Sequence, residues 1–457
     1  MKKILFILAG TLVLAGCKSY KNYERPQSIE DTAKEQLFRD VQGTDTMSFG
    51  NRPWREVFTD AQLQQLIEKA LAQNTDLQKA DHNIQKARIG LKVSKLSYLP
   101  TLAVAPQGQI ASFDGGKATK TYTLPLSLSW ELGSWGSLRN NRKKAGVDTL
   151  IAAGAKQATQ TAIVSAVANL YYTLQMLDEQ LRTTKETVNI WRENVRTMEL
   201  MKTAAMTTEA AVGQSRANLL QLEASVPALE SNIRQTENAL CALLHETPHP
   251  ISRGVFNADG FPSSFSTGVP AQLLSNRPDV RAKEMQLANA FYTVNAARAA
   301  FYPSLTISGQ GAWTNNAGAI INPGKILASA VASLTQPIFA NGMLRANLKV
   351  SKLQLEDAQL QFEQALLNAG QEVSNALMQY QSATAQEATM QQQVATLTHT
   401  LEQTQLLFKH TNNTSYLQVL TAQQSLIQAQ LSLISYKFDK VQAAISLYQA
   451  LGGGREA

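Results

Sequence analysis

The chain has 457 residues, a formal net charge of +7 at pH 7 and a hydrophobic share of 44%. The basic excess is slight, and neither basic clusters nor interleaved aromatic residues stand out, so the composition does not favour nucleic acid as a partner. The composition alone does not determine the fold class, so we consider the segments of the sequence in chain order.

The first residues have the pattern of a secretory leader. Two lysines precede an apolar run from Ile4 to Leu14, and the small residues Ala15 and Gly16 follow it. The run is too short and wrongly flanked for a membrane-spanning helix. We therefore predict a signal peptide over residues 1–16.

The end of this leader, Leu14–Cys17, resembles the lipoprotein box of bacteria. The resemblance implies that Cys17 is lipidated after cleavage and, because Lys18 is not aspartate, that the protein is sorted to the outer membrane. The alternative is an ordinary signal peptide beside a chance cysteine. If Cys17 is acylated, Cys241 has no partner for a disulfide within the chain, and we expect it to be a small buried side chain.

The next segments are a tether and two helices. Residues 17–53 are polar and weakly patterned, and we predict a lipidated N-terminal tether there. An amphipathic helix then runs from Asp60 to about Asn74. A second helix, capped by Asn74 or Thr75, continues to about Leu99 and ends at Pro100.

The clearest strand pattern lies between Thr121 and Arg139. Even positions from Tyr122 to Leu132 are apolar, whereas most of the odd positions between them are polar. This alternation puts one apolar face on a β-strand, whose length suits a membrane-crossing strand of roughly 9–11 residues. Residues Thr101–Phe113 can pair with it across the turn Asp114–Lys117. By itself, the pattern also fits a soluble hairpin.

The strand region occurs twice. Phe301–Trp313 mirrors Ser97–Gln109, and Ser333–Asn347 mirrors Ser127–Asn141. Such a duplication reports the architecture. We predict a first repeat over residues 54–247, a linker over 248–269, a second repeat over 270–451 and a C-terminal tail over 452–457.

Unusually long helices follow the two hairpins. Leu138–Ala204 and Met343–His410 contain no proline over 67 and 68 residues, and either helix would extend on the order of 100 Å. Such lengths point to a coiled coil or a helical barrel. The second return helix supports this, because its residues alternate steps of three and four with one polar interruption. These are Leu417, Leu420, Gln424, Ile427, Leu431, Ile434, Phe438, Val441, Ile445 and Tyr448.

The four predicted strands cannot close a membrane barrel alone. Strands in lipid need a closed barrel so that every backbone group is paired, and the smallest common barrels have about eight strands. The sequence therefore predicts an oligomer in which each copy supplies four strands. Two, three and four copies all remain open on symmetry alone.

Several motifs carry a family resemblance. Besides the lipoprotein box and the duplicated units, they are Asn276–Arg281 (NRPDVR), Ala297–Pro303 (ARAAFYP) and Ser415–Gln423 (SYLQVLTAQ). Together they resemble the TolC-like outer-membrane factors, in the lipoprotein branch that serves resistance–nodulation–division efflux systems. The resemblance covers about Trp54 to Leu451.

The resemblance implies an α+β membrane protein. It would be a homotrimer with a 12-stranded outer-membrane β-barrel, four strands per protomer, continued by a long periplasmic α-helical coiled-coil barrel. The implied partners are outer-membrane lipid, a periplasmic adaptor (membrane fusion) protein and an inner-membrane proton-driven transporter.

The resemblance also points to a periplasmic tip and entrance. The family usually has a glycine and an apolar residue in the tip turns, where this chain has Ala205-Met206 and Asn412-Asn413. Tyr416 and Thr421 follow the second turn. Many relatives have an aspartate where Thr421 stands, so we expect no cation-favouring carboxylate ring at this position. The alternative is that these are merely solvated turns.

We expect no enzyme, cofactor or metal site. His245 and His249 have helical spacing, but Pro248 and Pro250 break the helix that would use it. No phosphate-binding loop or nucleophile motif stands out. Methionines such as Met198, Met201 and Met206 fit packing better than soft-metal export.

Three hypotheses about the function of the protein remain. The favoured one is an outer-membrane exit channel of a tripartite efflux pump, through which drugs or other toxic compounds leave passively. The alternative on the same fold is the channel of an ATP-driven type I protein secretion system. A structural lipoprotein without a pore conflicts with the alternating strands.

Overall fold

The computed structural model describes residues 21–34, 37, 48–112, 114–132, 134–262, 265, 267, 273–314, 325–410 and 416–454. The chain divides into two compact units. The first comprises Met1–Ile29, His82–Gly154 and Arg281–Ala365, and the second comprises Glu30–Asp81, Ala155–Val280 and Leu366–Ala457. Each unit therefore takes segments from both predicted repeats.

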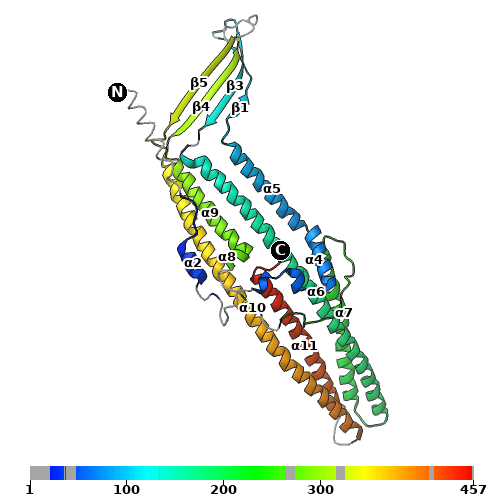
Figure 1. Ribbon diagram of the computed structural model, residues 1–457. Coiled ribbons are helices and arrows are strands. Elements are labelled where there is room, and N and C mark those ends of the chain that lie inside the picture. Colours follow the sequence, from blue (N-terminus) through cyan, green and yellow to red (C-terminus); the bar gives the residue numbers. More distant parts are fainter. Residues whose placement is uncertain are drawn as a thin grey trace. The chain divides into compact units, whose positions relative to one another are not determined.

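The first unit contains one antiparallel sheet (Figure 1). β3 (Thr119–Glu131) pairs along one side with β1 (Thr101–Val104) and then β2 (Gln107–Ala111). Its other side pairs with β4 (Ser304–Thr314), which pairs in turn with β5 (Lys325–Thr335). Because β1 and β2 share one neighbour, the sheet is four strands wide, as the two hairpins predicted.

One face of this sheet is apolar and open to its surroundings. The strand register places Leu102, Leu128, Gly309 and Ala330 in one row across the four strands. Leu126, in a neighbouring row, is 52% exposed. Among the described strands, neither the outer edge of β1 and β2 nor that of β5 has a partner. An apolar face with two open edges fits a barrel that other copies complete.

Four helices adjoin the sheet in sequence. They are α5 (Thr75–Leu96), α6 (Ser137–Thr203), α9 (Pro278–Ala299) and α10 (Met343–His410). The predicted long helices are confirmed, with 67 residues in α6 and 68 in α10. Asn74 caps α5, because its Oδ1 accepts from the backbone N–H of Asp76 at 2.8 Å. None of the described helices carries an apolar stretch long enough to cross a bilayer.

The segment expected as a tether contacts helix α9. The guanidinium of Arg25 donates to both carboxylate oxygens of Glu284, at 2.8 and 2.9 Å. The backbone N–H of Tyr23 donates to the hydroxyl of Tyr292 at 3.4 Å, and α2 (Gln27–Lys34) follows. The short η2 (Ser134–Gly136) lies between β3 and α6. The predicted lipidation site, Cys17, lies outside the described residues.

The second unit contains the return helices α7 (Glu209–Leu243) and α11 (Tyr416–Ala450). Five members of the predicted heptad seam are buried at steps of seven in α11; they are Leu420, Ile427, Ile434, Val441 and Tyr448. Leu417 and Gln424, which were expected in the same seam, are exposed. The seam is thus confirmed away from the tip, and near the tip Val419, Ala422 and Gln423 are buried instead.

Shorter elements complete this unit. They are η1 (Phe49–Asn51), α3 (Trp54–Val57), α4 (Ala61–Gln73) and α8 (Leu273–Asn276). The hydroxyl of Tyr448 donates to the carbonyl of Arg52 at 2.7 Å, and that of Tyr380 donates to the carbonyl of Pro262 at 3.0 Å. Cys241 is buried, as expected from the sequence.

Candidate functional site: the helical tip

The turn between α6 and α7 is a defined helix ending. The N–H of Met206 donates to the carbonyl of Met201 at 2.8 Å, and the N–H of Ala205 donates to that of Lys202 at 2.9 Å. This pair of bonds is the Schellman arrangement, which satisfies the last carbonyls of a helix. It needs a left-handed residue, and Ala205 takes that conformation with φ 60°.

Alanine at this position carries a conformational cost. A left-handed backbone brings Cβ close to the following carbonyl, which costs roughly 1–2 kcal/mol for a residue other than glycine. Ala205 departs from the glycine that the resemblance implies for this turn, and its positive φ angle is one that glycine adopts more easily. The turn forms nevertheless, and the Met206 side chain is 71% exposed.

The following helix begins with a polar cap. The hydroxyl of Thr208 accepts from the backbone N–H of Ala211 at 3.3 Å, which satisfies one free donor of the first turn of α7. Lys202 forms an ion pair with Glu209 across the turn. The hydrogen bond from Lys202 holds the pKa of the Glu209 carboxyl below its usual range. Charge pairing and capping therefore both stabilise this tip.

Further ion pairs continue along α6 and α7. The members on α7 are spaced by seven residues, and the pairs are Lys202–Glu209, Glu199–Arg216, Arg192–Glu223 and Lys185–Glu230. We call these four pairs the α6–α7 ladder. Its spacing is that of the flanking charges of a coiled coil. The sequence analysis missed it, although the repeat at 209, 216, 223 and 230 was a usable signal.

The second tip is described from Tyr416 onwards. The ring of Tyr416 packs edge-on against Phe408, with ring centroids 5.1 Å apart. Burial raises the pKa of the Tyr416 phenol to about 12. The Thr421 hydroxyl donates to the carbonyl of Leu417 at 2.9 Å, and the side chain is exposed. Asn412 and Asn413 lie outside the described residues.

The predicted tip residues fall on two helical pairs. In Figure 1 the turn of α6 and α7 and the start of α11 lie at the same end of the second unit. The described contacts of Ala205 and Met206 stay within the α6–α7 pair, and those of Tyr416 and Thr421 stay within the α10–α11 pair. The fold thus brings the two regions to one end without joining them by a described contact.

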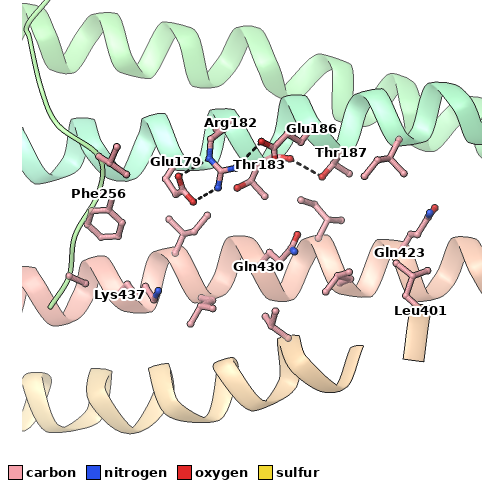
Figure 2. Close-up of a pocket in the computed structure, with 18 of the residues that line it drawn as sticks. Glu179, Arg182, Thr183, Glu186, Thr187, Phe256, Leu401, Gln423, Gln430 and Lys437 are labelled. Carbon is pink, nitrogen blue, oxygen red and sulfur yellow. Dashed lines mark hydrogen bonds and ion pairs between the residues drawn. The ribbon is translucent and has the colours of Figure 1, made fainter. Parts of the chain in front are cut away.

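A groove opens between α6 and α11, further from the turns. It has a volume of about 480 Å³, and Trp191, Ile427 and Gln430 are among the residues that line it. Figure 2 shows Arg182 between two carboxylates, and its guanidinium lies 2.5 Å from Glu179 and 2.8 Å from Glu186. The groove offers mixed polar and apolar walls but no cluster of catalytic groups.

Hydrogen bonds join the two helices at either end of this groove. The amide of Asn194 donates to Gln423, and that of Gln180 donates to the hydroxyl of Ser435 at 3.4 Å. Among the described residues, no group of three or more His, Cys, Asp or Glu side chains is arranged to hold a metal ion.

A family model described as outer membrane efflux protein matches residues 66–245 and 269–453. The "Probable outer membrane lipoprotein SilC" of Salmonella typhimurium is 28% identical over 458 residues, which cover 98% of this chain and 98% of the relative. The "Solvent efflux pump outer membrane protein SrpC" of Pseudomonas putida is 26% identical, over 97% of this chain and 96% of the relative.

The fold also matches a solved channel. The crystal structure of CusC superposes with a TM-score of 0.85 at 27% identity, over 96% of this chain and 100% of that chain. The "Cation efflux system protein CusC" of Escherichia coli (strain K12) is 28% identical, over 97% of both chains. These similarities span almost the full length, so they concern both the sheet and the long helices.

Proposed function

The chain belongs to the outer membrane efflux protein family, and on that basis we propose that it receives small molecules from a periplasmic adaptor and an inner-membrane proton-driven transporter. The compounds then leave the cell passively through its channel. The energy for export comes from the transporter, and the chain itself does no chemistry.

The family membership places the chain in the outer membrane as an efflux channel. Its fold class is the one predicted from the sequence, a trimeric barrel of four strands per protomer continued by a helical tunnel. The observation that carries the function is the sheet, whose exposed apolar face and two open edges adjoin long helical pairs in one chain.

The tip proposal concerns six residues, Ala205, Met206, Asn412, Asn413, Tyr416 and Thr421. We assign the exposed Met206 turn to contact with the adaptor, because it is a capped helical ending with an apolar side chain at its outside. We assign Tyr416 and Thr421 to the entrance. Both flank the buried stretch Val419–Leu420 on the first turns of α11.

The proposal for the anchor is that Cys17 carries the lipid and that residues 17–53 link it to the repeats 54–247 and 270–451. The contacts of Tyr23 and Arg25 with α9 support a short connection. Metabolic labelling with an alkyne palmitate tests this. Labelling of the parent that persists in Cys17→Ala would contradict it.

A deletion strain tests the export function. Loss of the gene should raise susceptibility to several small toxic compounds, and the parent gene should restore resistance. Profiling should include metal cations and organic solvents, because the name of CusC states a cation efflux system and that of SrpC states a solvent efflux pump. A deletion that leaves every susceptibility unchanged, but abolishes release of a secreted protein, would favour the secretion alternative.

A further inference from the structure

Four helix ends meet one edge of the sheet. The register pairs Thr101 with Ser129 and Ser304 with Thr335, so β1 and β4 begin where β3 and β5 end. Helices α5 and α9 lead into that edge, and α6 and α10 leave from it. The turns of these helices nearest the strands therefore lie around a single end of the sheet.

The two helices of the first repeat carry basic side chains there and no acidic ones. Between His82 and Tyr98 the cations are Lys86, Arg88, Lys92 and Lys95, and all four are exposed. Between Ser137 and Val147 they are Arg139, Arg142, Lys143 and Lys144. Neither stretch contains Asp or Glu.

The second repeat continues the pattern. Arg298 is exposed in the last turn of α9, and the first turns of α10 carry Arg345, Lys349 and Lys352 on exposed positions. No Asp or Glu occurs between residues 285 and 303 or between 336 and 355. We call these twelve side chains the basic collar.

The collar lacks neutralising partners among the described residues. No ion pair joins any member to a carboxylate, whereas ion pairs with carboxylates are frequent along α6 and α7 in the second unit. Lys143 lies over the ring of Tyr292, 5.3 Å from its centroid. Its pKa is lowered by partial burial and by the nearby charge of Arg139. Arg139 and Lys143 are thus close enough to repel each other.

Aromatic side chains occupy the level between the collar and the apolar strands. The indole of Trp135 donates to the carbonyl of Pro303 at 2.7 Å, and its ring lies 5.6 Å from that of Tyr302. The indole of Trp130 donates to the carbonyl of Tyr98 at 3.0 Å. Trp and Tyr at the ends of membrane strands mark the level of the lipid headgroups.

We propose that the basic collar binds the headgroups of anionic phospholipids at the membrane surface beside the helical end of the sheet. From the sheet outwards the chain presents apolar strands, then aromatic rings, then cations without a carboxylate partner. A membrane leaflet presents acyl chains, an interface and charged headgroups in the same order. Clustered Lys and Arg next to a membrane-spanning segment attract acidic lipids in this way.

Symmetry strengthens the case. In a closed ring of identical copies about an axis along the membrane normal, a residue keeps the same height in every copy. A neighbouring copy therefore brings its own collar to this level, and with it more cations. Since no ion pair with a carboxylate balances these cations among the described residues, acidic headgroups at the surface of a membrane that the apolar sheet face enters would supply the negative charge.

The test measures lipid binding to the full-length assembly by native mass spectrometry. Phosphatidylglycerol and phosphatidylethanolamine with identical acyl chains are titrated separately at low and high ammonium acetate concentration. The parent should bind phosphatidylglycerol about 10-fold or more tightly than phosphatidylethanolamine, and the preference should shrink with salt. The triple variant Arg139→Gln, Arg142→Gln, Lys144→Gln should lose most of it.

A matched control removes three charges elsewhere. Arg196→Gln, Arg234→Gln and Lys409→Gln together alter exposed positions on α6, α7 and α10 in the second unit, and this variant should keep the parent's preference. If the first triple variant does not assemble, Lys92→Gln, Lys95→Gln, Arg345→Gln takes its place. A parent without preference, or collar variants that bind like the control, would overturn the proposal. The measured lipid preference does not depend on export, so a result against the channel function would not affect the proposal that the basic collar binds anionic phospholipids.

Discussion

Arg192 on α6 and Glu223 on α7 face each other, with 2.8 Å between Nη2 and Oε1. They form one step of the α6–α7 ladder, whose other steps include Lys185–Glu230 and Glu199–Arg216. Exposed pairs of this kind each add little to stability, because water and salt screen them. Their regular spacing suggests that they set the register of the two helices rather than supply most of the stability.

Charge reversal tests the ladder. Glu223→Lys with Glu230→Lys places like charges opposite Arg192 and Lys185, and we expect a lower thermal midpoint at low salt, followed by circular dichroism. Adding Arg192→Glu and Lys185→Glu should restore it. Glu193→Lys, at an exposed position outside the ladder, is the control. A double variant that melts like this control at low salt would show that the pairs are incidental.

The turn at Ala205 should be improved by glycine. Ala205→Gly removes the Cβ from a residue with φ 60°, and we expect a gain of about 1 kcal/mol in the stability of the helical pair. Ala204→Gly is the control, since Ala204 is not left-handed and glycine there relieves no such strain. Equal midpoints for the two variants would mean that the turn relaxes in solution.

Tyr416 should make stability depend on alkaline pH. Burial raises its pKa to about 12, above the ordinary value of about 10 for an unfolded chain. The folded state thus favours the protonated phenol, and its contribution is complete below pH 10 and lost as pH rises towards 12. Tyr416→Phe keeps the ring against Phe408 and removes the titration. The thermal midpoints of the parent and of Tyr416→Phe should agree at pH 8, and the midpoint of the variant should fall less between pH 10 and 12. If the two midpoints fall in parallel over this range, ionisation of Tyr416 does not control the stability.

Much of the fold follows from local periodicity. The predicted helix Met343–His410 has the same bounds as α10, and Leu138–Ala204 differs from α6 by one residue at each end. Alternation between Tyr122 and Leu132 located β3 because successive side chains of a strand point to opposite faces of the sheet. A repeat of two residues indicates a strand and a repeat of seven indicates a packed helix. Both repeats can be read from the sequence because they involve residues that are close together in the chain.

Other features of the fold depend on contacts between segments that are far apart in the sequence. Arg25 and Glu284 are separated by 259 positions, so no pattern predicts their ion pair. Four of the collar cations lie within residues 139–144 and were visible in the sequence, but the other eight are spread over three helices that the sheet brings to the same edge. Near the tip the seam shifts from Leu417 to Val419, which heptad counting could not detect because several faces there are apolar.

The entrance residues should influence ion flow. Thr421 is exposed near the start of α11, and Thr421→Arg would place a cation at each copy's entrance. We expect lower conductance and reduced cation preference in planar bilayers, since fixed positive charge in a pore repels cations. Arg196→Gln, which also changes an exposed charge on a long helix, should have little effect. If Thr421→Arg behaves like the parent over a range of salt, the constriction lies elsewhere.

The most direct test of the channel is the conductance of the purified parent protein in planar bilayers without adaptor, transporter or nucleotide. A passive pore assembled from several copies should give discrete current steps that grow with salt concentration and need no added energy source. Bilayers that incorporate the assembled protein, yet carry no current across the accessible voltage range, would contradict an exit channel.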